Sequence, residues 1–497
     1  MENNTVLVRE TPGPVKVTQK REPDAEKLAR LAAFGPYAAL FAAASAFGRY
    51  KNPAGIACSL PVIVFFVLMR RLRDRGSSGA VRKASPMYVF SGVTCILLSV
   101  HVWTSASGVL QFLDRCGILI LSCICLLQLA FDDAGWHPGM YLLQILKVIL
   151  LPLRRLPIPF ADIVETVRSR RESRTAPAHL YAVLKGLAAG VPILFVILLL
   201  LSDADAVFNR LIADLVGGFS LPSVVLDAVR LAALLTVSFI VFYTVSSSVF
   251  GKKEELSAEE GTSAGRRHDP WTAVTVCLLL CAVYVVFGGI QLVYLAGRRP
   301  LPQGLTYAQY AHEGFYQLAA VCVINLVIVT WCSERYEKSR LLSVLLLVMS
   351  LCTYSMIASS AYRMFLYIRE YDLTFLRLFV LWFLLVLCIW FGFVCAGILK
   401  EDLPVFRSCV IAAAVLYLVF AFAHPDYHIA RYNMSAAGRA DRVYLAAQLS
   451  DDAVPALARD PELIALRRKY KNSAKSRDSF GADPRKFNLS SFIASRY

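Results

Sequence analysis

The chain changes character at the stretch His424-Pro425-Asp426-Tyr427-His428-Ile429-Ala430-Arg431-Tyr432-Asn433, where the last of a series of long apolar runs stops. Back to about Leu31, the chain repeats apolar runs long enough to cross a bilayer as helices, which takes roughly 17–25 residues. The runs lack the alternation of outer-membrane strands, and a helix satisfies its own backbone hydrogen bonds. The sequence therefore predicts an all-α fold. We expect a polytopic transmembrane helix bundle over residues 31–423 and a tail over residues 424–497.

Composition agrees with this class. Of the 497 residues, 57% are hydrophobic and 18% are charged, whereas a soluble domain is nearer half apolar and about a quarter charged. The net charge of +16 would suggest nucleic acid in a soluble protein, but here the basic residues flank apolar runs. They indicate orientation in the membrane and attraction to anionic lipid. We therefore expect the lipid bilayer as a partner and no nucleic acid.

The expected spans cover about residues 31–47, 54–69, 88–103, 116–131, 183–201, 224–250, 272–296, 315–332, 341–360, 375–398 and 405–423. This gives about eleven crossings with the N-terminus inside and the C-terminus outside. Segments expected inside carry 27 Lys and Arg, against 8 in the loops expected outside, as the positive-inside rule requires. Tyr141–Leu151 is too short to cross comfortably and has Lys147 at its middle, so we expect an amphipathic helix at the cytoplasmic surface. If it crossed, the count would become twelve and the orientation of the later half would invert.

The segments outside the spans are expected to differ in kind. Residues 1–30 read as a disordered cytoplasmic arm, about 132–182 as a cytoplasmic interfacial segment, and 251–271 as a charged cytoplasmic linker. Ala44-Ser45-Ala46 resembles a signal-peptidase site, but the long polar lead-in favours an uncleaved anchor. The tail is expected to be extracytoplasmic, with short amphipathic helices, and flexible from about residue 467.

Under this topology the unusual polar residues collect on one side of the membrane. We name them the outer-face set: Asp227, Arg230, His312, Glu313, Arg363, Glu370, Arg377, Asp426, His428, Arg431 and Asn433. Ionisable residues near membrane depth are costly and usually pair or line a cavity. The set could form an outward-facing polar cavity, or it could consist of anchors and ion pairs that fix helix ends. The second interpretation is favoured.

Motifs for catalysis or metal binding are weak. The sequence contains no Walker A loop, no HExxH site and no Gly-x-Ser-x-Gly elbow. Asp203 and Asp205, and the group His424, Asp426 and His428, have ligand side chains, but helix capping explains both better. The 13 cysteines, including the pairs Cys123-x-Cys125 and Cys277-x3-Cys281, are better explained as buried small apolar residues. We therefore assign no catalytic, cofactor-binding or metal residue.

Three stretches together resemble a known group of proteins. They are Tyr307–Leu318, Ser360–Arg377 and Asp426–Asn433. They are similar to the bacterial multi-pass membrane proteins of domain of unknown function family 4173, related to family 4153, over about residues 180–460. The resemblance implies a multi-pass architecture in the bacterial cytoplasmic membrane, and it supplies no residue role to transfer. In that family the last motif commonly begins Asn-Pro-Asp, whereas this chain has His424-Pro425-Asp426.

The leading functional hypothesis is a non-catalytic integral membrane protein that acts in envelope sensing, assembly or regulation through its outer face. Its expected partners are other membrane or envelope proteins, and no cofactor is expected. The alternative is a transporter for a small or lipid-linked solute, with the outer-face set lining a cavity. A third hypothesis is an intramembrane enzyme in which Glu313, Glu370 or Asp426 serves as a base.

Overall fold

The structure is a computed structural model that describes residues 24–76, 85–130, 136, 138–171, 223–250, 268–296, 315–400, 403–435, 441–470 and 483–497. These residues form helices and turns. No β-sheet occurs among them, and their β-type pairing is an isolated bridge between His268 and Tyr336. The chain divides into two compact units. Unit 1 comprises Met1–Pro36 and Leu156–Ser220, and unit 2 comprises Tyr37–Arg155 and Leu221–Tyr497.

The described part of unit 1 consists of the beginning of α1 (Ala25–Arg49) and of α6 (Pro157–Arg171). The guanidinium of Arg30 donates to both carboxylate oxygens of Asp162, from Nε at 2.7 Å and from Nη2 at 2.8 Å. The Asp162 side chain is fully buried. This two-bond contact joins α6 to the start of α1. Separating the two helices would leave the buried Asp162 carboxylate without a compensating charge, which is costly.

Unit 2 contains the remaining helices. Before the tail these are η1 (Ile56–Cys58), α2 (Ser59–Gly76), α3 (Pro86–Thr104), α4 (Gly108–Ala130), α5 (Pro138–Arg154), α9 (Ser223–Phe250), α11 (Pro270–Ala296), α13 (Phe315–Arg335), α14 (Arg340–Tyr371), α15 (Phe375–Leu399) and α16 (Val405–Phe422). The tail contains α17 (Pro425–Ser435), α18 (Arg442–Ala447), η2 (Asp451–Ala453), α19 (Val454–Leu457), α20 (Pro461–Tyr470), η3 (Pro484–Lys486) and α22 (Leu489–Ala494).

Nine helices among the described residues are long and apolar enough to cross a membrane: α1, α3, α4, α9, α11, α13, α14, α15 and α16. They expose large apolar side chains, such as Leu351 at 69% and Val283 at 64%, as a lipid-facing surface does. The prediction of a multi-pass helical membrane protein is confirmed. The count of eleven and the orientation stay predictions. The expected span 54–69 corresponds to α2, which continues into a cluster of four arginines, and the expected span 183–201 lies outside the described residues.

One boundary differs clearly from expectation. The span expected to end at residue 360 continues as α14 to Tyr371, so the loop expected over 361–374 is mostly helix. With 32 residues, α14 is about 48 Å long. Arg363 and Glu370 therefore lie on the last turns of a helix and not in a loop. The expected span ended at residue 360, whereas the helix is longer than the hydrocarbon layer and continues beyond it.

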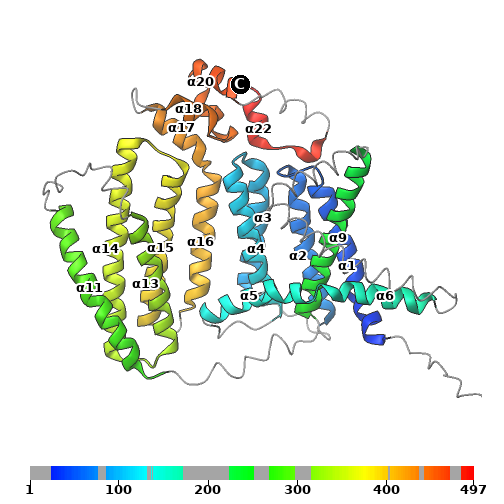
Figure 1. Ribbon diagram of the computed structural model, residues 1–497, viewed down its shortest axis with the longest axis horizontal. Helices are drawn as coiled ribbons and strands as arrows, with labels where there is room; N and C mark the ends of the chain where they lie inside the picture. Colours follow the sequence, from blue (N-terminus) through cyan, green and yellow to red (C-terminus); the bar gives the residue numbers. More distant parts are fainter. Residues whose placement is uncertain are drawn as a thin grey trace, which may run out of the picture. The chain divides into compact units, whose positions relative to one another are not determined.

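The helix α5 covers the interfacial segment Tyr141–Leu151. It lies across the ends of α3 and α4 in Figure 1 rather than alongside them. Tyr141 and Val148 are buried, and the Tyr141 ring stacks on Phe406 of α16 with 4.1 Å between centroids. Leu142, on another face of the helix, is 70% exposed. That this helix lies at a membrane surface, and on which side, stays a prediction.

The tail helices gather at the end of unit 2 opposite α5 (Figure 1). Short helices were expected there, but a flexible segment was expected from about residue 467. Within that range, α20 continues to Tyr470 and residues 483–497 include η3 and α22, while the flexibility itself stays a prediction. The Asn488 amide, which also caps α22, donates to the carbonyls of Ser105 at 2.9 Å and Ala54 at 3.3 Å. The polar composition of this segment suggested that it is solvated. The Asn488 amide instead bonds the segment to the backbone at Ala54 and Ser105.

The long helices of unit 2 form two groups. The first helix group comprises α2, α3, α4, α5 and α9, and the second comprises α11, α13, α14, α15 and α16. The groups meet at α16, which Tyr141 of α5 contacts and against which α3 and α4 also lie. We call the contact of α3 and α4 with α16 the seam. The tail contacts both groups, through α17 on α15 and through α22 on α3. It therefore covers one end of the seam.

Candidate functional site

The first members of the outer-face set lie at the start of α9. Asp227 forms an ion pair with Lys51, in the turn after α1, and a longer one with Arg230, whose Nη1 is 3.8 Å away. The Tyr50 hydroxyl donates to the Asp227 carbonyl at 3.1 Å. Arg230 is 70% exposed, and exposed ion pairs contribute only about 0–1 kcal/mol. These contacts fix a helix end.

A second part of the set lies around the turn between α14 and α15. Arg377 donates to the carbonyls of Tyr371 and Asp372, which end α14, and its guanidinium lies 4.2 Å from the centroid of the Tyr367 ring. Arg363 is buried in α14, with 7% exposure, whereas Glu370 is exposed. Through its two bonds to the Tyr371 and Asp372 carbonyls, Arg377 caps the C-terminal end of α14.

A third part lies on α17. The Asn433 amide is buried and bonds both backbone groups of Leu373, accepting from its N–H and donating to its carbonyl at 2.9 Å each. The buried Asp426 carboxylate accepts from the Ser450 N–H at 3.1 Å. His428 and Arg431 lie on the exposed face of the same helix. The described members of the set thus bind different partners, while His312 and Glu313 lie outside the described residues.

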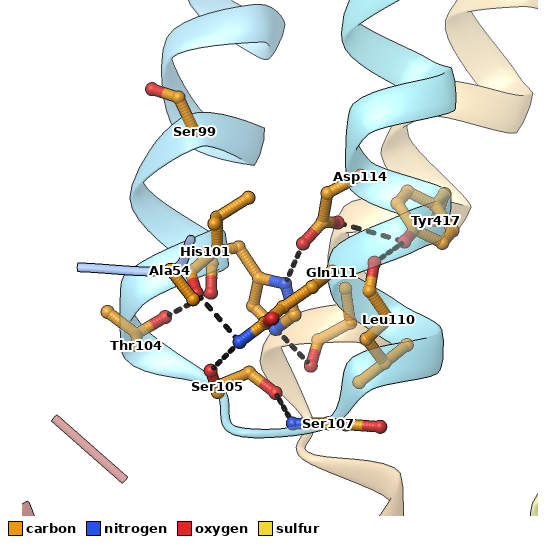
Figure 2. Close-up of polar contacts among 12 residues, drawn as sticks. Ala54, Ser99, His101, Thr104, Ser105, Ser107, Leu110, Gln111, Asp114 and Tyr417 are labelled. Carbon is orange, nitrogen blue, oxygen red and sulfur yellow. Dashed lines mark hydrogen bonds and ion pairs between the residues drawn. The ribbon is translucent and has the colours of Figure 1, made fainter. Parts of the chain in front are cut away.

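Sequence reasoning missed a buried polar network inside the seam. His101 of α3 and Asp114 of α4 are both 0% exposed, and His101 Nδ1 lies 2.8 Å from Asp114 Oδ2. The Tyr417 hydroxyl of α16 donates to Asp114 Oδ1 at 2.9 Å. His101 Nε2 lies 3.0 Å from the carbonyl of Ala421, also on α16. Figure 2 shows the His101 ring and Tyr417 converging on the Asp114 carboxylate from two helices. Two of these contacts cross the seam.

A tight turn brings His101 and Asp114 together. The helix α3 ends at Thr104 and α4 begins at Gly108, so the two helices are antiparallel neighbours. The Ser105 Oγ accepts from the Ser107 N–H at 3.1 Å, and Gln111 Nε2 donates to the carbonyls of Val102 and Ser105 (Figure 2). These bonds satisfy backbone groups that a helix end leaves unpaired. His101 lies about one turn before this loop and Asp114 about two turns after it, so their side chains face each other.

The tail binds the same turn. Asp452 of η2 accepts from the Ser105 hydroxyl at 2.6 Å and from the Ala106 N–H at 2.8 Å. His424 Nδ1, in the turn between α16 and α17, lies 3.4 Å from Asp452 Oδ2. Burial by itself would raise the pKa of Asp452, but hydrogen bonds from His424, Ser105, Ser490 and the Ala106 N–H together hold it below its ordinary value. The carboxylate is therefore charged at neutral pH, and it joins the tail to the seam.

A second buried network lies in the other helix group and is neutral. The Tyr284 hydroxyl of α11 donates to Asn325 Oδ1 of α13 at 2.7 Å. Asn325 Nδ2 donates to Thr353 Oγ1 of α14 at 3.0 Å. Asn325 and Thr353 are both 0% exposed. Hydrogen bonds of this kind join membrane helices without any buried charge.

The seam is the candidate site because it holds ionisable groups within membrane helices. Such residues are rare, expensive and usually functional, or else structural pairs that hold helices together. A signal existed in the sequence, since His101 falls inside an apolar run. Its partners were not visible, because Ala421 is 320 positions away along the chain. No group of three or more His, Cys, Asp or Glu able to hold a metal occurs among the described residues.

Comparison with known proteins identifies a family. The model of a domain of unknown function, DUF4153, matches residues 92–459, which is most of the chain and includes the seam and the tail as far as residue 459. The match is to the related family 4153, whereas the three stretches had suggested family 4173. No curated protein and no solved structure matches the chain significantly. The match over residues 92–459 shows that the chain belongs to the DUF4153 family of domains of unknown function.

Proposed function

We propose that this integral membrane protein is a non-catalytic component in envelope sensing, assembly or regulation, and that it acts through the face that carries the tail. The observation behind the proposal is the anchoring of the tail by Asp452. This carboxylate has a fully buried side chain and is bonded to the turn between α3 and α4. A tail fixed in this way presents a defined surface to a partner, instead of a tethered flexible segment.

The exposed face of α17 has the composition of a binding surface. Its buried face holds Asp426 and Asn433, which fix the helix, and its opposite face exposes His428, Arg431 and Tyr432. Tyr and Arg are enriched at protein interfaces, where they supply large contact areas and directed hydrogen bonds. This division separates residues that hold the tail from residues free to contact a partner.

The proposed side of the membrane is the outer one. The distribution of Lys and Arg favours an inward N-terminus and an outward tail. The positions of α5 and the tail at opposite ends of unit 2 support this, since α5 is the segment expected at the cytoplasmic surface (Figure 1). A topology reporter fused after Tyr497 should therefore report an extracytoplasmic C-terminus.

The test is photocrosslinking in cells from position 432. With a photoreactive amino acid in place of Tyr432, we expect a discrete adduct with a membrane or envelope protein at native expression. The double variant His428→Ala and Arg431→Ala should abolish the adduct without lowering the protein level. The exposed Arg459 provides the matched control, because Arg459→Ala lies outside α17 and should leave the adduct unchanged. Absence of any adduct, or a cytoplasmic C-terminus, would contradict the proposal.

A second candidate function, transport of a small or lipid-linked solute, is favoured by the ionisable groups within the seam. A cavity of about 170 Å³ between α13, α14 and α15 includes Arg377 and Tyr367 in its lining. It is smaller than the roughly 300–1,000 Å³ typical of small-molecule pockets.

If the protein is a transporter, replacing the buried Arg363 or the exposed Glu370 by Ala should abolish uptake without lowering abundance. A fall in abundance alone would assign these residues a structural role.

A further inference from the structure

The His101 ring lies between two hydrogen-bond acceptors. On one side Nε2 contacts the Ala421 carbonyl at 3.0 Å, and a carbonyl oxygen can only accept. Nε2 must therefore carry a hydrogen. On the other side Nδ1 lies 2.8 Å from Asp114 Oδ2. A contact this short between a ring nitrogen and a carboxyl oxygen also requires a hydrogen between them. The pair consequently needs one proton more than a neutral imidazole beside a carboxylate.

We propose that His101 and Asp114 form a proton-binding site inside the membrane helices, and that the bound proton holds the seam together. The ligand is a proton taken from water at the face that carries the tail. It is shared between Nδ1 and Oδ2, as an imidazolium beside a carboxylate or as an imidazole beside a carboxylic acid. The hydroxyl of Tyr417 supports both forms, since it donates to the other oxygen, Oδ1.

Loss of the proton breaks one of the two contacts of the His101 ring, either the one to the Ala421 carbonyl across the seam or the one to Asp114 beside the seam. The departing proton goes to water and leaves a neutral imidazole and a carboxylate. If the remaining ring hydrogen stays on Nε2, the lone pair of Nδ1 faces the negative Asp114. If it moves to Nδ1, the lone pair of Nε2 faces the Ala421 carbonyl, and the bond between α3 and α16 is lost. Either result weakens the packing of the two helix groups against each other.

The groups around His101 are few. Asp114 faces it from α4, and Tyr417 reaches that carboxylate from α16. His424 lies with its ring centroid 6.0 Å away, and its own Nδ1 is 3.4 Å from Asp452 Oδ2. Of the other elements packed on α3, α22 has no titratable side chain, and the charged residues of α2 lie in its last turns. The thiol in η1, Cys58, turns toward the carbonyls of Gly48 and Asn52.

Two His–Asp pairs in series provide a route for the proton. His101–Asp114 is fully buried, whereas the His424 side chain is 33% exposed at the surface of the tail. His424 is thus placed between solvent and the buried ring. A purely structural contact would not require this arrangement, because the neutral Tyr284–Asn325–Thr353 network joins three helices without any titratable carboxylate or imidazole. The proton site does not depend on which partner the tail binds.

The test is side-chain ¹⁵N NMR of the full-length, histidine-labelled protein in lipid nanodiscs, with infrared spectroscopy of the carboxyl groups. The chain has seven histidines, and the His101 signals are assigned by their loss in His101→Gln. If that variant fails to fold, single Gln replacements of the other histidines assign them by elimination. At about pH 8, where an ordinary histidine is neutral, we expect either both His101 nitrogens protonated or a carboxylic-acid stretch that disappears in Asp114→Asn.

The signals of the exposed His428, recorded in the same spectra, provide the internal reference. The proposal also predicts that amide exchange of the last turns of α16 accelerates when the pair finally loses its proton at higher pH. Asp114→Asn should remove that acceleration. A neutral His101 ring together with the absence of an Asp114 carboxylic acid at about pH 8 would overturn the proposal. So would amide exchange at α16 that depends on pH identically in the wild type and in Asp114→Asn.

Discussion

Two buried polar networks join membrane helices in this protein, and they differ in charge. The network of Tyr284, Asn325 and Thr353 connects α11, α13 and α14 through neutral hydrogen bonds. The seam network connects α3, α4 and α16 through His101 and Asp114, both of which can ionise. The first shows that neutral groups suffice to fix helix packing in this fold. Packing alone therefore does not explain why the seam carries ionisable residues.

The networks also differ in what lies beyond them. The neutral network stays within one helix group, whereas the seam network joins two groups and continues into the tail through His424 and Asp452. Removing one partner of a buried ionisable pair leaves a charge or an acceptor without compensation. Removing one neutral partner within a membrane has a smaller effect, because other partners are found nearby. The predictions below use this difference, from the largest expected effect to the smallest.

The largest effect is expected for Asp114→Ala. The substitution leaves His101 Nδ1 and the Tyr417 hydroxyl without their common acceptor, and breaking a buried pair costs about 3–5 kcal/mol. The free energy of unfolding, measured in detergent by thermal or chemical denaturation, should fall by that amount. Asp74 on α2 is exposed, so Asp74→Ala serves as the control and should change stability by no more than about 0.5 kcal/mol. Equal losses in the two variants would contradict the role assigned to the seam.

The next effect concerns Asp452 and pH. Its pKa is lowered in the folded protein, so its contribution to tail docking is present above the ordinary value of 3.8 and is lost as the pH falls through the lower, folded value. Hydrogen bonds to a charged group contribute about 1.5–3 kcal/mol, and Asp452→Asn should weaken docking by about that amount at neutral pH. Hydrogen exchange of residues 441–470 measures it. Wild-type exchange should accelerate only below about pH 4, and the variant should lack that acceleration. A variant with the wild-type pH profile would argue against this anchor.

A smaller effect is expected in the neutral network. Asn325→Leu removes two side-chain hydrogen bonds, and such bonds in membrane proteins average about 0.6 kcal/mol with a maximum near 1.7. The unfolding experiment used for Asp114→Ala should therefore show a clearly smaller loss. If Asn325→Leu destabilised the protein as much as Asp114→Ala, the distinction between the two networks would be lost.

The smallest effect is expected for the substitution His424→Asn, at a residue whose φ is 50°. Asn adopts this left-handed region readily, so His424→Asn should change stability by less than about 0.5 kcal/mol, even though the contact with Asp452 is lost. A β-branched residue is strained there, and His424→Val should cost about 1–2 kcal/mol. Thermal unfolding of the two variants in parallel provides the measurement. Tolerance of Val as good as that of Asn would mean that the backbone at this turn relaxes freely.

The membrane architecture was predictable because long apolar runs have few alternatives. Nine expected spans have counterparts among the helices that could cross a membrane, and the short run at Tyr141 is the separate helix α5. Apolar content does not distinguish a lipid-facing residue from one facing another helix. For that reason the sequence located the helices but not the contact between α3 and α16.

Polar positions were harder to interpret. Arg363 and Glu370 were placed in an outer loop over residues 361–374, yet α14 continues to Tyr371. Asp114 was likewise placed in an outer loop and is fully buried on α4. Its environment depends on His101 and Tyr417, the second of which is 303 positions away. Tertiary partners at such separations leave no periodic pattern in a single sequence.

The most direct test of the difference between the networks is a pair of double-mutant cycles on the free energy of unfolding. The first combines Asp114→Ala with Tyr417→Phe across the seam, and the second combines Asn325→Ala with Tyr284→Phe in the neutral network. A hydrogen bond to a charged group contributes about 1.5–3 kcal/mol, so the seam cycle should give a coupling energy of that size when Asp114 is the carboxylate of the pair. The neutral cycle should give about 0.6 kcal/mol. Equal coupling energies, or a larger one in the neutral network, would contradict the account.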